Sequence, residues 1–190
     1  MDLILLADSL DSSQPLLRAA SRAGYRLLKL VGRDDAAAGY VESLRPDAMI
    51  IVSDQIDEPI LREMNAVMKT RPIPMVIFTR DSTREAIDRA VKAGATTYVV
   101  DCNEPERLSS LLGVARARFD EQQRLKKELS MTKNALQERK SVEKAKGIIM
   151  KSKSLSEDQA YRAMRRLAMN HNKRIGEIAK QIISASEVLV

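Results

Sequence analysis

Five short apolar runs lie in the first 100 residues, and stretches with the apolar spacing of helices separate them. The runs cover residues 3–7, 25–31, 48–52, 75–79 and 98–100. They are apolar nearly throughout and not at alternate positions only, which is typical of parallel strands that helices cover on both faces. The alternation of strand and helix therefore predicts a doubly wound, flavodoxin-like α/β domain over residues 1–104.

The chain changes character after residue 105. It has no further proline, and no glycine between Gly113 and Gly147. Leu125, Leu129 and Leu136 follow the heptad spacing of a seam that runs from about residue 111 and includes several polar residues. This pattern predicts a long linker helix over residues 105–137 that forms a homodimeric coiled coil through those three leucines. The alternative is a long exposed helix packed on its own domain.

Residues 138–190 have the pattern of a small helical bundle. The long helix is expected to continue to Lys151, and Ser156 with Gln159 forms a capping box that begins a second helix. A third helix is expected to start at Lys173. Short amphipathic helices such as these bury their apolar stripes only by packing on one another.

The basic charge of the chain is concentrated in this tail. The whole chain has 32 lysines and arginines against 26 acidic residues, whereas residues 138–190 have 12 against 6. A slightly acidic front and a basic tail favour a second module that touches a polyanion such as a nucleic acid. The alternative is a solvated helix surface that happens to be rich in lysine.

Several classes of site are excluded or unsupported. One cysteine, Cys102, rules out an internal disulfide, and one histidine leaves little for a catalytic triad or a metal site. Phosphate-binding glycine motifs are absent. We therefore expect no enzyme activity, no cofactor and no metal. No apolar run reaches the ~18 residues of a membrane span, so we expect no membrane association and a cytoplasmic location.

The tail residues resemble the ANTAR domain, the RNA-binding output module of the AmiR/NasT family of transcription antiterminators. The resemblance is carried by Glu143, Ala145, Lys146, Gly147, Met150, Ala160, Tyr161, Met164, Arg165, Ala168, Met169, Ile178, Ala179 and Ile182. Residues 1–104 are similar to the receiver domain of bacterial response regulators. Within the family, the chain looks most like the NasT-type regulators of nitrate and nitrite assimilation.

This resemblance implies a protein that binds paired hairpins in leader mRNA and prevents a terminator from forming. It also implies a partner, a NasS-like nitrate/nitrite sensor protein that sequesters the regulator. The candidate RNA-binding residues are Lys146, Lys151, Tyr161, Arg165, Arg166, Lys173 and Arg174. Tyr161 also fits a core position, and Gly147 favours close approach by a helix or by RNA. A DNA-binding regulator and a scaffold remain the alternative functions.

A receiver needs an acidic pair for Mg²⁺, an aspartate acceptor, a hydroxyl residue and a lysine. The resemblance aligns these positions with Asp8 alone, Val52, Thr79 and Asp101, so three of the five groups are missing. Asp54 lies two residues beyond the acceptor position and is the rival acceptor, without compensating charges. We therefore expect a pseudo-receiver that serves dimerisation and partner docking.

Overall fold

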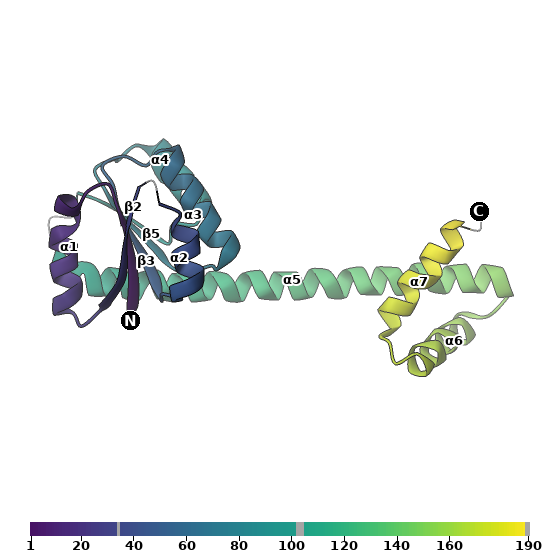
Figure 1. The fold of residues 1–190 in the computed structure, drawn as a ribbon. Helices are drawn as coiled ribbons and strands as arrows, with labels where there is room; N and C mark the ends of the chain where they lie inside the picture. The colour runs from purple at the N-terminus through teal and green to yellow at the C-terminus, as the bar shows by residue number, and fades with distance from the viewer. Residues whose placement is uncertain (34, 102–104, 189–190) are drawn as a thin grey trace. The chain divides into compact units, whose positions relative to one another are not determined.

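The structure is a computed structural model that describes residues 1–33, 35–101 and 105–188. It divides into two compact units, Met1–Gln123 and Arg124–Val190, and the long helix α5 (Leu108–Lys153) contributes residues to both (Figure 1). Among the described helices, none combines the length and the apolar character needed to cross a bilayer.

The front unit is built on a five-stranded parallel sheet. The strands are β1 (Asp2–Ala7), β2 (Arg26–Gly32), β3 (Ala48–Val52), β4 (Met75–Thr79) and β5 (Thr97–Val100). Their spatial order is β2-β1-β3-β4-β5, and every neighbouring pair is parallel. The order reverses direction at β1, as in a doubly wound sheet, so the expected flavodoxin-like fold is confirmed.

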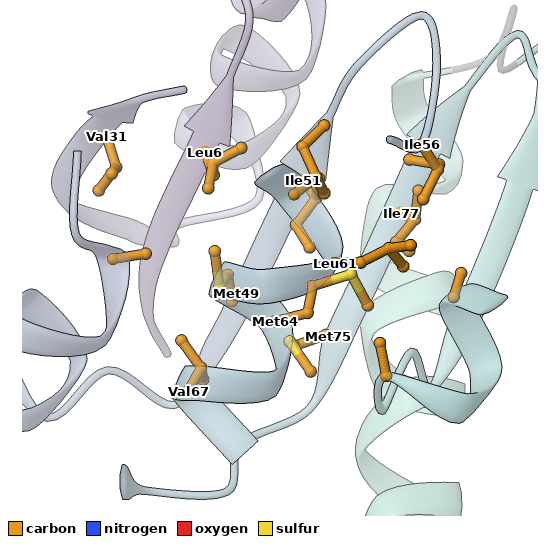
Figure 2. Close-up of a cluster of buried hydrophobic side chains, with 14 of the residues drawn as sticks. Leu6, Val31, Met49, Ile51, Ile56, Leu61, Met64, Val67, Met75 and Ile77 are labelled. Atoms are coloured by element: carbon orange, nitrogen blue, oxygen red, sulfur yellow. The ribbon is translucent and has the colours of Figure 1, made fainter. Parts of the chain in front are cut away.

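Helices cover both faces of this sheet. They are α1 (Leu10–Arg22), α2 (Ala37–Leu44), α3 (Glu58–Thr70) and α4 (Arg84–Lys92), with a 3-10 turn, η1 (Pro105–Arg107), before α5. One buried cluster joins β1, β3 and β4 to α2, α3 and α4, and Figure 2 shows its aliphatic and methionine side chains interdigitating. A second cluster lies on the other face, under α1 and the first turns of α5.

The beginning of α5 belongs to the core of the front unit. Leu108, Leu112 and Ala115 are buried against the sheet, and Leu111 packs beside them. The expected seam includes Leu111 and Ala115, but these residues already have partners within the chain. The exposed part of the apolar stripe on α5 consists of the leucines further along.

The tail unit is a three-helix bundle. The last turns of α5 pack with α6 (Glu157–Asn170) and α7 (Ile175–Val188). The buried core consists of Ala145, Ile149, Ala160, Met164 and Ala179. The capping box of Ser156 and Gln159 is present, as expected.

Two boundaries in the tail differ from the expectation. The long helix continues to Lys153, and Ser154 turns the chain with a φ of 49°. The third helix begins at Ile175 and not at Lys173, after Asn172 with a φ of 50°. The reason is local: the backbone N–H of Arg174 donates to Oε2 of Glu177 at 3.2 Å, which makes Arg174 the residue that precedes the first helical turn.

Candidate functional site

The register of the sheet gathers the receiver-type residues at one edge. Ala7 lies beside Val52, Val52 beside Phe78, and Thr79 beside Val100. Because the carboxyl ends of parallel strands meet at the same edge, the residues that follow them are neighbours. They line a cavity of about 250 Å³ with Asp8, Val52, Asp54, Thr79, Arg80 and Asp101 in its wall.

Asp8 is held by groups that the sequence did not reveal. Its Oδ1 accepts a hydrogen bond from Arg33 at 3.0 Å, and its Oδ2 accepts from the Ser53 hydroxyl at 2.6 Å and the Asp54 N–H at 3.2 Å. The second arm of the Arg33 guanidinium pairs with Asp57. The carboxylate that a metal ion would need is therefore already paired with a cation of the chain, which it shares with Asp57.

The remaining receiver positions are placed as follows. Val52 is nearly buried and packs with the cluster under α1. Thr79 Oγ1 donates to the backbone carbonyl of Asp54 at 3.1 Å and accepts from the Asp81 N–H at 3.1 Å. The Asp54 carboxylate is 71% exposed and lies 3.6 Å from Arg80 Nε.

Asp101 follows β5 in a left-handed conformation with a φ of 49°. Among the described residues, no group of three or more histidine, cysteine or acidic side chains is arranged to hold a metal ion. Cys102 lies outside the described residues.

Arg33 and Asp57 carry a weak signal that sequence reasoning missed. Arg33 comes two residues after the end of the second apolar run and directly after β2, which places it at the same edge of the sheet. Asp57 is the N-cap of α3, where its side chain accepts from the Ile60 N–H at 3.4 Å. Their contact could not be predicted, because it joins two loops that are distant in sequence.

In the tail, Lys146 has a different environment from the one expected. Its side chain is only 11% exposed, and its Nζ lies 2.7 Å from Glu143 and 2.7 Å from Glu157. The hydrogen bonds to Glu143 and then to Glu157 raise the pKa of the Lys146 ammonium, and the bond from Lys146 lowers the pKa of Glu157. Lys146 thus ties α5 to the first turn of α6. A buried and doubly paired ammonium is not presented to a phosphate, so we leave Lys146 out of the candidate interface.

Tyr161 is exposed and does not take the core position. It is 44% exposed, and Met169, on the same helix, is 73% exposed. Arg165 lies between them, and the spacing of four places all three side chains along one flank of α6. Met164 and Ala168, by contrast, are buried on the face of the helix that packs in the bundle.

The other predicted contacts are exposed cations. They are Lys151 at the end of α5, Arg165 and Arg166 on α6, and Lys173 and Arg174 before α7. Within the described residues, none of these side chains pairs with a carboxylate. Several acidic side chains of the tail are paired elsewhere, as in Asp158 with Arg162 at 2.7 Å and Glu187 with Lys144 at 3.2 Å. The charge that remains for a ligand is therefore positive.

Gly147 has open space around it. A Cβ atom on Gly147 would meet nothing within 4 Å, so no close helix packing explains this glycine.

The three leucines of the expected seam are exposed on α5. Leu125, Leu129 and Leu136 are 51%, 55% and 55% exposed. They have no apolar cover within the described chain.

Comparison with known proteins assigns the tail. Residues 131–183 match the family model of the ANTAR domain. The transcriptional regulatory protein PdtaR of Mycobacterium tuberculosis is 26% identical over 160 residues, which cover 84% of this chain and 78% of that protein. A nitrate regulatory protein of Klebsiella oxytoca is 40% identical over 74 residues, 39% of this chain and 19% of that protein.

Solved structures match the front of the chain. A receiver domain of a diguanylate cyclase from Desulfovibrio desulfuricans aligns with a TM-score of 0.55 and 15% identity, covering 64% of this chain and 97% of that one. A CheY-like receiver protein from Methanospirillum hungatei aligns with a TM-score of 0.52 and 16% identity, covering 65% and 96%. These likenesses show the receiver fold. The chain therefore carries an ANTAR domain over residues 131–183, preceded by an α/β domain with the receiver fold.

Proposed function

We propose that the chain is an RNA-binding transcription antiterminator that acts in the cytoplasm on paired hairpins in the leader mRNA of nitrate/nitrite assimilation genes. The observation that carries this proposal is the flank of α6 on which Tyr161, Arg165 and Met169 are exposed together. An aromatic ring and a guanidinium on one face suit an unstacked base and its phosphate. A surface that served only solubility would have no reason to expose Tyr161 and Met169.

Further unpaired cations are exposed on the tail unit. Arg166, Lys173 and Arg174 are exposed and have no carboxylate partner among the described residues. They supply charge for the backbone of a nucleic acid. Tyr161 favours RNA loops over duplex DNA, because stacking needs a base that is free of its helix.

Homodimerisation through α5 is the second part of the proposal. Leu129 and Leu136 fall on a positions of a heptad, and Leu125 falls on a d position. The flanking g positions are Glu121 and Glu128, and the flanking e positions are Lys126, Lys133 and Lys140. A parallel pair of helices sets glutamate opposite lysine, whereas an antiparallel pair sets like charges together. The pattern therefore supports a parallel dimer.

Control by a sensor protein, and not by aspartate phosphorylation, is the third part. Val52 offers no acceptor oxygen, and Arg33 occupies the Asp8 carboxylate. Asp101 adds negative charge where a receiver has a lysine. The input must then come through a binding partner, and we propose a NasS-like nitrate/nitrite sensor, since one relative is named a nitrate regulatory protein. The test of the partner is co-purification of such a sensor with the tagged chain, and its release by nitrate or nitrite.

The RNA-binding test uses the full chain and RNA hairpins selected by it from a pool with randomised loops. Tyr161→Ala should weaken binding by roughly 1–3 kcal/mol, the cost of one lost stack, while Tyr161→Phe should bind as the wild type does. Arg165→Ala should lower the salt slope, which is the fall in log affinity per unit of log salt concentration, by roughly one unit. Lys92→Ala on α4 removes the same charge from the front unit and should change neither.

Duplex DNA of matching sequence serves as the competitor. Equal competition by duplex DNA would favour a DNA-binding regulator. If folded Tyr161 and Arg165 variants keep wild-type affinity and slope, the RNA surface on α6 is refuted.

A further inference from the structure

A polar groove lies between α5 and α7, within the tail unit. It has a volume of about 330 Å³. Asn134, Gln137 and Glu138 line it from α5, and Arg174, Glu177 and Lys180 line it from the segment that begins α7. None of these six residues lies on the flank of α6 described above.

The α5 wall of the groove presents two side-chain amides. Asn134 and Gln137 are three residues apart and so lie on one face of the helix. Both are exposed, and within the described residues neither side chain has a hydrogen-bond partner. An amide can donate and accept at once, which is how Asn and Gln read the edge of a base.

The α7 wall adds positive charge. The side chains of Arg174 and Lys180 are exposed, and in the described part of the chain neither is paired with a carboxylate. The Glu177 carboxylate accepts the N–H of Arg174 at 3.2 Å, so it is committed to the start of the helix. The groove thus offers two amides and two cations beside the carboxylates of Glu138 and Glu177. The amides match a base edge, and the cations match the phosphates on either side of it.

Gly176 keeps the groove open. A Cβ atom on Gly176 would lie 2.6 Å from Oε1 of Glu138 and would push that side chain aside. Glycine at this position thus leaves room for the Glu138 side chain, which lines the groove.

We propose that this groove is a subsite for one unpaired nucleotide of an RNA loop. The amides of Asn134 and Gln137 contact the base edge, and Arg174 and Lys180 contact the flanking phosphates. The proposal rests on the proposed RNA-binding function and deepens it: the flank of α6 supplies affinity, and the groove supplies loop specificity.

The test compares the full-length wild type with three variants on selected hairpins and on the same hairpins with scrambled loops. The double variant Asn134→Ala/Gln137→Ala should lose about 5- to 150-fold of the preference for the selected loop, the range of one bidentate base contact. Its salt slope should stay unchanged. Gln181→Ala removes an exposed amide of α7 that does not line the groove and serves as the matched control, with no change in preference.

Gly176→Ala is the second variant, because it removes no polar group and displaces the Glu138 side chain that lines the groove. It should also lower the preference for the selected loop. The third variant, Lys180→Ala, should reduce the salt slope by roughly one unit and leave the preference intact. Circular dichroism and thermal unfolding show that each variant is folded.

Two failures are distinguishable. If the wild-type chain selects no hairpin over random RNA, the proposed function fails, and the subsite fails with it. If the wild type is selective and the folded double variant and Gly176→Ala are equally selective, the RNA function stands and the subsite alone is overturned.

Discussion

Truncating Leu129 tests the proposed dimer most directly. Leu129 is 55% exposed in the single chain, so a second helix can bury about half of its side chain. Full burial of a leucine contributes about 1.5–3 kcal/mol, so two half-buried copies contribute roughly 1.6–3.3 kcal/mol to one dimer. Alanine keeps the Cβ atom. We therefore expect Leu129→Ala to raise the dimer dissociation constant about 10- to 100-fold, at 1.4 kcal/mol per factor of ten.

Sedimentation equilibrium over a range of protein concentrations measures this constant. Met131→Ala is the matched control: Met131 is 63% exposed, yet it lies about 200° around α5 from Leu129 and so off the seam. It should leave association unchanged. A Leu129→Ala dimer as tight as the wild type would refute the reasoning, and so would equal weakening by Met131→Ala.

Three further predictions concern the ion pairs of the tail and the receiver pocket. Lys146→Met should lower the unfolding midpoint of the tail without changing the salt slope of RNA binding. Lys144→Met is the control: it removes an exposed ion pair and should change the midpoint little. A reduced salt slope in Lys146→Met would show that Lys146 contacts a phosphate. Because Lys146 lowers the folded-state pKa of Glu157, their pair stabilises the tail above the ordinary glutamate pKa and is lost as pH falls through the lowered one. Glu157→Gln should thus lower the midpoint at neutral pH, and this deficit should shrink as the pH falls below the ordinary pKa of a glutamate, as followed by circular dichroism. A deficit that does not shrink on acidification contradicts the pair. Acetyl phosphate should leave no stable adduct by mass spectrometry, and an adduct on Asp54 that alters RNA affinity would overturn the pseudo-receiver proposal.

The three central strands, β1, β3 and β4, were predictable because they are buried on both faces. The apolar run at residues 48–52 coincides with β3, and that at 75–79 coincides with β4. A strand covered by helices leaves a continuous apolar signal bounded by polar residues. The capping box before α6 was equally visible, since its two partners are only three residues apart.

The misplaced features depend on contacts between distant segments. Lys146 fell outside the apolar stripe of α5, and its pairing with Glu157 required knowledge of where α6 begins. The bridge of Arg33 to Asp8 and Asp57 joins three loops. The start of α7 was set by Glu177 and not by the basic residues ahead of it. Helical periodicity reports one segment at a time and carries no information about such pairs.

The Arg33 bridge changes what can loosen the front unit. A bound metal ion exchanges with solution, and its occupancy follows its concentration. A guanidinium belongs to the chain, stays charged at every physiological pH and cannot be removed by a chelator. The ends of β1 and α3 that Arg33 joins are therefore held together independently of the cell's magnesium supply.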